Sequence, residues 1–133
     1  VDYKEARNLA VALSESGSDG VLVTGTTGET PTLTLEEKLR LYGEISEALS
    51  GKAAVIAGST TYDTAHSVEL SKEAERIGVD AILMTVPSYN KPPQDGLYEH
   101  FKKYNSIGFI RQCRGGDSVV NKRNSCPRGR FGN

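Results

Sequence analysis

Two short stretches of the chain are near copies of one another: residues 17–22 read GSDGVL and residues 78–83 read GVDAIL. Each follows a run of apolar residues at helical spacing and opens a short run that is apolar throughout. The chain therefore repeats a helix–strand unit of roughly thirty residues. Such repeats are typical of an α/β fold in which helices cover a parallel sheet. A barrel and an open doubly wound sheet both satisfy the pattern.

The spacing of apolar residues also predicts the individual elements. Thr34 and Glu37 form a capping box that starts a helix, and Gly51 ends it. Gly17 stands where the left-handed end of a helix favours glycine. We expect strands over residues 20–24, 53–57 and 81–86, and further helices over residues 2–16, over about 62–77 and from about 94.

A glycine- and threonine-rich loop follows the first predicted strand. It reads Gly25-Thr26-Thr27-Gly28-Glu29. Glycines at both ends allow a sharp turn and close approach to a ligand, and the threonines offer hydroxyl and backbone N–H groups to a small anion. We therefore predict a carboxylate or phosphate site here; the alternative is a turn that only redirects the chain.

Composition and motifs exclude several classes of protein. The chain is 37% hydrophobic and 25% charged, which is ordinary for a soluble protein. No apolar run approaches the ~20 residues of a membrane helix and no charged-then-apolar leader marks secretion, so we expect a cytoplasmic protein. Cys113 and Cys126 suit neither a zinc site nor a disulfide framework, and His66 and His100 are expected on the surface or at helix flanks. No phosphate-loop or dinucleotide fingerprint is present, so we expect neither a metal nor an organic cofactor.

The last thirty residues differ from the rest in charge and pattern. Residues 1–103 carry 10 Lys/Arg against 16 Asp/Glu, whereas residues 104–133 carry 6 against 1. The second segment has no helical face and only a short strand fragment around 118–120. We predict two segments: residues 1–103 as an α/β domain, and residues 104–133 as an unrelated basic tail from a shifted reading frame, a cloning scar or a misrecorded sequence. A nucleic-acid arm is the alternative, but its aromatic and helical features are absent.

Three motifs together resemble a known family. They are the Gly25–Glu29 loop, residues 88–92 (SYNKP) and residues 94–101 (QDGLYEHF), supported by residues 55–58 (VIAG). In order and spacing they resemble the dihydrodipicolinate synthase branch of the dihydrodipicolinate synthase / N-acetylneuraminate lyase family, which are pyruvate-dependent class I aldolases. The likeness covers residues 1–103. The Thr-Thr pair and the Tyr-Asn-Lys-Pro run favour this branch over the sialic acid lyases.

The resemblance implies a fold, a reaction and roles for particular residues. The family fold is a (β/α)₈ barrel, normally a homotetramer, and its lysine forms a Schiff base with pyruvate for condensation with aspartate semialdehyde in lysine and diaminopimelate biosynthesis. By resemblance, Thr27 binds the pyruvate carboxylate between Gly25 and Gly28. Thr26 passes protons between two tyrosines, and Tyr89 is one of them, reaching across a subunit interface. Packing at that interface is the simpler role for Tyr89.

The resemblance also implies that parts of the family's machinery are missing. The Schiff-base lysine, the second tyrosine and the substrate-binding arginine belong beyond residue 103, and the first barrel strand belongs before residue 1. Lys91 and Lys102 fall in a loop and a helix. We therefore expect a partial barrel that is inactive alone and leaves apolar faces uncovered. The alternatives are another pyruvate-dependent aldolase acting on a sugar acid, and a non-catalytic half-barrel.

Overall fold

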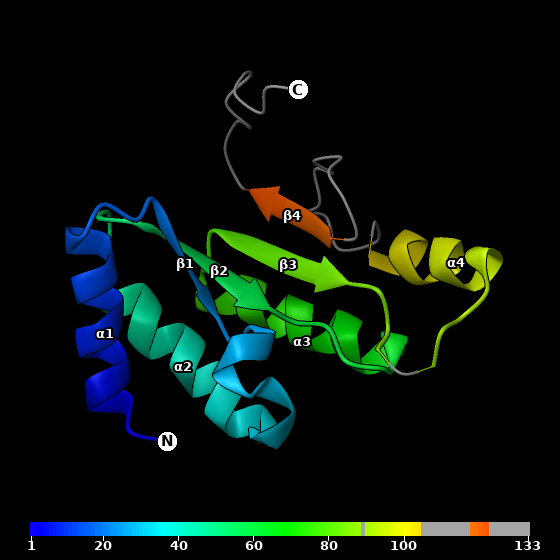
Figure 1. The fold of residues 1–133 in the computed structure, drawn as a ribbon, viewed down its shortest axis with the longest axis horizontal. Coiled ribbons are helices and arrows are strands. Elements are labelled where there is room, and N and C mark those ends of the chain that lie inside the picture. Colours follow the sequence, from blue (N-terminus) through cyan, green and yellow to red (C-terminus); the bar gives the residue numbers. More distant parts are fainter. Residues whose placement is uncertain (89, 105–117, 123–133) are drawn as a thin grey trace.

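The computed structural model describes residues 1–88, 90–104 and the backbone of 118–122 (Figure 1). Helices and strands alternate along the first 104 residues. In chain order they are α1 (Tyr3–Glu15), β1 (Gly20–Val23), α2 (Leu35–Ala48), β2 (Ala54–Gly58), α3 (Thr64–Ile77), β3 (Ala81–Thr85) and α4 (Gln94–Tyr104). Two short 3₁₀ turns, η1 (Thr26–Gly28) and η2 (Thr30–Thr32), lie between β1 and α2, and β4 (Ser118–Lys122) follows α4.

The strands form one sheet in the order β1-β2-β3-β4. β1 and β2 pair in parallel with Gly20 opposite Ala54, and β2 and β3 pair in parallel with Ile56 opposite Ala81. The predicted parallel arrangement of the first three strands is therefore confirmed. β4 pairs antiparallel with β3, and this pairing was not predicted, because the sequence indicated only a strand fragment at 118–120.

Local signals in the sequence explain where the helices begin and end. Thr34 and Glu37 form the predicted capping box, with the Glu37 amide donating to the Thr34 hydroxyl at 3.2 Å and the Thr34 amide donating to the Glu37 carboxylate at 2.9 Å. Asp2 and Asp63 cap α1 and α3 with their side chains. Gly17 follows α1 and Gly78 follows α3, each with φ of 101°, the left-handed conformation that glycine adopts most readily.

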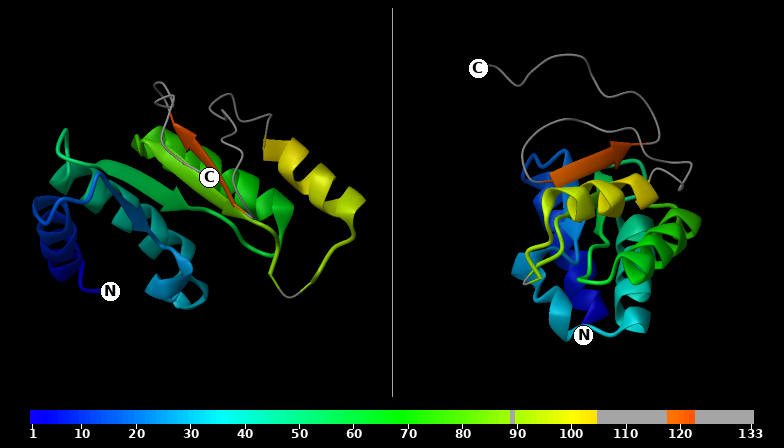
Figure 2. Two further views of the ribbon diagram at one scale, coloured as in Figure 1. Left: turned by 45° about the horizontal axis from the view of Figure 1, so that its top comes forward. Right: turned by 90° about the vertical axis from the view of Figure 1, so that its right-hand side faces the viewer.

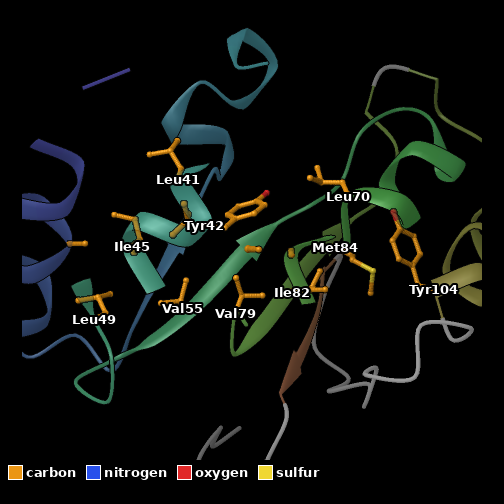
Figure 3. Close-up of a cluster of buried hydrophobic side chains, with 14 residues drawn as sticks. Leu41, Tyr42, Ile45, Leu49, Val55, Leu70, Val79, Ile82, Met84 and Tyr104 are labelled. Carbon is orange, nitrogen blue, oxygen red and sulfur yellow. The ribbon is translucent and has the colours of Figure 1, made fainter. Parts of the chain in front are cut away.

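The core lies between one face of the sheet and helices α1 to α3 (Figure 3). Val23, Val55 and Ile82 project from the strands into it, and Leu41, Ile45 and Leu70 project from α2 and α3. Figure 2 shows α1 and α4 at opposite ends of the molecule, and α4 packs on α3.

Several large apolar side chains stay outside this core. Leu9 and Leu13 of α1 are 62% and 39% exposed. Leu22 points to the opposite face of the sheet from Val23 and is 42% exposed. These exposed residues agree with the expectation that a partial barrel leaves apolar surfaces uncovered.

Candidate functional site

The carboxyl ends of β1, β2 and β3 lie at the same end of the sheet, as the parallel pairing requires (Figure 1). The loops that follow them carry the residues singled out from the sequence. Sites in parallel α/β folds are built at this end of the sheet, because the loops after neighbouring strands converge there. The candidate site is therefore the loop after β1 and the residues that support it.

The loop after β1 folds into the 3₁₀ turn η1. The Gly28 amide donates to the Gly25 carbonyl at 2.9 Å, and the Glu29 amide donates to the Thr26 carbonyl at 3.1 Å. Thr26 and Thr27 are exposed. Within the described part of the chain, their hydroxyls and amide N–H groups make no hydrogen bond. The loop thus presents two hydroxyls and two amides that are free to bind an anion.

The two glycines of this loop do not make the sharp turn that the sequence led us to expect of them. Gly25 has φ of −74°, an ordinary value, and left-handed backbone occurs instead at Thr24 and Glu29, with φ of 56° and 53°. A Cβ at Gly25 would lie 2.8 Å from the Leu22 Cδ2 atom, whereas one at Gly28 would meet nothing within 4 Å. A side chain at Gly25 would only displace the tip of the half-exposed Leu22, and the chain turns at Thr24 and Glu29, which flank the two glycines.

Thr24 is held by a buried polar group that joins three elements. Its hydroxyl donates to the Gly58 carbonyl at 2.9 Å and lies 2.8 Å from the Tyr42 hydroxyl. The Tyr42 hydroxyl also donates to the Gly58 carbonyl, at 2.8 Å. Tyr42 is fully buried, and burial raises the pKa of its hydroxyl to about 12. No local sequence pattern marks Tyr42 for this role, so it was missed.

Further contacts fix the turn between β1 and the loop. The Thr30 hydroxyl donates to the carbonyls of Thr24 and Gly25, the second at 2.8 Å. A Cβ at Gly58 would lie only 2.5 Å from the Thr24 carbonyl oxygen, so only glycine fits there. Backbone and side chains thus constrain Thr24 from both sides.

The loops after β2 and β3 use their hydroxyls within the protein. Ser59 is fully buried and its hydroxyl accepts from Ser71 at 2.7 Å. The Thr60 hydroxyl accepts from the Thr85 amide at 2.8 Å, which ties the ends of β2 and β3 together. Both residues therefore support the ends of the strands from within the protein.

His100 differs from its expected place. His66 is exposed, as predicted, but His100 is only 3% exposed, with its Nδ1 atom 2.8 Å from the Thr64 hydroxyl. The expectation for His100 was wrong because α4 packs its His100 face on α3. Burial lowers the pKa of His100, so its ring favours the neutral form.

The expected positions of the two lysines are confirmed. Lys91 is exposed in the loop after β3, and Lys102 lies in α4, where it pairs with Glu99 at 3.0 Å. Lys38 is buried along α2, and burial lowers its pKa.

Tyr89, the predicted relay residue, lies outside the described residues, as do Cys113, Cys126 and most of the predicted tail. The predicted boundary after Lys103 therefore stays a prediction. Among the residues that the structure describes, no three His, Cys, Asp or Glu side chains are grouped as a metal site would require. In the same part of the chain, no helix has the length and apolar character to cross a membrane.

Comparison with known proteins identifies the family that this chain resembles. The model of the dihydrodipicolinate synthetase family matches residues 1–108. A 4-hydroxy-tetrahydrodipicolinate synthase from Moorella thermoacetica is 56% identical over 102 residues, covering 77% of this chain and 35% of the relative. The enzyme of the same name from Desulforamulus reducens is 51% identical, covering 77% of this chain and 34% of the relative. The chain thus spans about a third of the length of the curated relatives it matches.

Solved structures show the same likeness. Dihydrodipicolinate synthase from Cyanidioschyzon merolae, crystallised with lysine bound, has a TM-score of 0.77 and 43% identity, covering 80% of this chain and 36% of that one. The enzyme from Aquifex aeolicus gives the same TM-score, identity and coverage. The three parallel β–α units therefore form part of a (β/α)₈ barrel, as predicted.

Proposed function

Because the chain belongs to the dihydrodipicolinate synthetase family, we propose that the complete protein is a 4-hydroxy-tetrahydrodipicolinate synthase. This lyase condenses pyruvate with aspartate semialdehyde through a Schiff base on a lysine, in the biosynthesis of diaminopimelate and lysine. The complete protein works as a homotetramer without a cofactor. The names of relatives at 56% and 51% identity support the proposal.

The observation that carries the proposal is the exposed pair Thr26 and Thr27 at the carboxyl end of β1. Thr27 binds the pyruvate carboxylate through its hydroxyl and amide, while Gly25 and Gly28 frame the loop that holds it. Preorganised N–H and O–H donors stabilise a carboxylate in a site from which water is excluded. The free donors of this loop fit that role.

Thr26 takes the other role in this proposal, that of proton relay with Tyr89. A hydroxyl both donates and accepts a hydrogen bond, so a chain of hydroxyls moves a proton without placing a charge in the site. Thr26 is exposed on η1, where a partner from the rest of the protein has access to it.

The test replaces the matching 102 residues of the Moorella thermoacetica enzyme with those of this chain. The chimera should consume pyruvate and aspartate semialdehyde in a coupled assay. Thr27→Val removes one hydrogen bond to a charged group, so kcat/KM for pyruvate should fall roughly tenfold to a hundredfold. Thr32→Val, in the neighbouring turn, removes an exposed hydroxyl that bonds within the protein, to the Glu29 carbonyl at 2.8 Å, and as the control it should stay within twofold of the parent.

Two outcomes would contradict the proposal. A folded chimera that does not consume pyruvate, when the unaltered Moorella thermoacetica enzyme does, would show that these residues do not supply the pyruvate-binding loop of a 4-hydroxy-tetrahydrodipicolinate synthase. Equal activity of the Thr27→Val and Thr32→Val variants would remove Thr27 from the carboxylate site.

A further inference from the structure

The carboxyl ends of β1 and β2 are joined by three oxygen atoms that contact one another. They belong to the Thr24 hydroxyl, the Tyr42 hydroxyl and the Gly58 carbonyl, at separations of 2.8, 2.9 and 2.8 Å. Figure 3 shows Tyr42 directed from α2 toward β2. Thr24 is 8% exposed and Tyr42 is fully buried, so water does not compete for these contacts.

Counting protons shows what each hydroxyl does. The three contacts share only two hydroxyl protons, because a carbonyl oxygen has none. If either hydroxyl is removed, the Gly58 carbonyl still accepts a hydrogen bond from the other. The carbonyl therefore needs only one of the two hydroxyls, and the second must have another role. With the Thr24 proton on the Gly58 carbonyl, the single Tyr42 proton goes either to that carbonyl or to the Thr24 oxygen, and in the second arrangement Tyr42 gives the Thr24 side chain a second partner.

Thr24 needs such a partner because of its backbone. A β-branched residue seldom adopts a positive φ, and Thr24 has φ of 56°. This residue is the last before the Gly25–Gly28 turn, so its φ sets the direction in which Thr26 and Thr27 leave the sheet. If Thr24 relaxed to an extended conformation, the turn would leave the end of β1 in another direction.

We propose that Tyr42 is a positioning residue, whose hydroxyl holds Thr24 in the left-handed conformation and thereby presents Thr26 and Thr27 to the carboxylate of a keto acid. The ligand part of this inference rests on the proposed function, whereas the conformational part does not. Because burial raises the pKa of Tyr42 to about 12, the hydroxyl stays protonated at neutral pH.

The experiment compares the parent chain with Tyr42→Phe by NMR. A residue with positive φ gives a strong intraresidue HN–Hα NOE, and we expect this NOE at residue 24 to weaken in the variant. The amides of Thr26 and Thr27 should broaden by exchange, and the Kd for pyruvate should rise about fivefold, the effect of losing one hydrogen bond. The matched control is Tyr98→Phe, at a tyrosine that is 66% exposed on α4, and it should reproduce the parent.

If Tyr42→Phe fails to fold, a second pair of variants tests the Thr24 hydroxyl, through which Tyr42 acts. Thr24→Val removes the hydroxyl at nearly constant shape and should reproduce the loss of the NOE and the broadening. Thr24→Ser keeps the hydroxyl and should retain the parent spectrum. Loss of the NOE in both, or in neither, would overturn the proposal.

The readouts separate this inference from the proposed function. If the parent chain shows no pyruvate-dependent shifts at Thr26 and Thr27, the carboxylate role fails for this chain, and the ligand-free NOE still decides the role of Tyr42. If the parent binds pyruvate and Tyr42→Phe binds it within twofold with an unchanged NOE, the positioning role is wrong.

Discussion

In the folded chain the hydroxyl group of Tyr42 is buried away from water and is hydrogen-bonded within the protein. Burial raises its pKa to about 12, above the value of about 10 in an unfolded chain. Below pH 10 both states are protonated, so stability is unaffected. Between pH 10 and 12 only the unfolded state ionises, and the free energy of unfolding falls.

This difference gives a pH prediction for a single residue. Between pH 9 and pH 11, the free energy of unfolding of the parent chain should fall by about 1 kcal/mol more than that of Tyr42→Phe. Urea unfolding at the two pH values measures the difference, and the other tyrosines cancel because both proteins contain them. Parallel pH profiles would show that Tyr42 ionises at its ordinary pKa.

At the residue scale, the exposed side chains of the candidate site could be predicted from the sequence, whereas the buried side chains that hold its loop in place could not. Thr26 and Thr27 stood out because adjacent hydroxyls after an apolar strand are a local pattern. The partnership of Tyr42 with Thr24 is not local, since it depends on how α2 crosses the end of β2. For the same reason the burial of His100 between α4 and α3 could not be predicted from its neighbours in sequence.

At the scale of elements, the capping box of α2 contributes a measurable share of stability. Thr34→Ala removes the acceptor of the Glu37 amide, so the free energy of unfolding should fall by about 1 kcal/mol. Thr34→Ser keeps an acceptor and should lose less. Denaturant unfolding of the two variants and the parent measures both effects, and equal stability of all three would contradict a capping role.

The elements themselves were predicted well because their signals are local. The capping box fixed the start of α2, and Gly17 and Gly78 marked the ends of α1 and α3. Helix and strand bounds differ from expectation by one or two residues. The antiparallel pairing of β4 with β3 was not predictable, because pairing between distant strands leaves no comparable local signal.

At the scale of the whole molecule, the chain exposes apolar surface that the other elements of a complete barrel would cover. Leu9 and Leu13 lie one helical turn apart on α1, at 62% and 39% exposure. Exposed apolar patches promote association between molecules. We therefore expect the weight-average mass of the chain to rise with concentration in light scattering.

Paired variants test whether this face of α1 is responsible. Leu9→Lys with Leu13→Lys should shift the mass toward the monomer. Asn8→Lys with Ala12→Lys makes the same charge change at two exposed positions of the same helix, and should leave association unchanged. A parent chain that is monomeric throughout, or a control pair that disrupts association equally, would contradict the prediction.

The position of the lysines decides what the chain does alone. A Schiff base with pyruvate requires a lysine amine that faces the site at a strand end. Among the described residues, strands β1 to β3 contain no lysine, and Lys91 is exposed in a loop. The backbone of Lys122 pairs opposite Ala81, at the amino end of β3 and therefore away from the candidate site.

The chain incubated with pyruvate and borohydride should accordingly give no stoichiometric adduct by intact-mass spectrometry. The Moorella thermoacetica enzyme, treated in the same way, is the positive control for trapping. Scattered, substoichiometric labelling of surface lysines would agree with the prediction, because any exposed amine reacts slowly with a carbonyl compound. A single-site adduct at full occupancy would contradict it, since a lysine of this chain would then form the Schiff base without the remaining two thirds of the relatives' length.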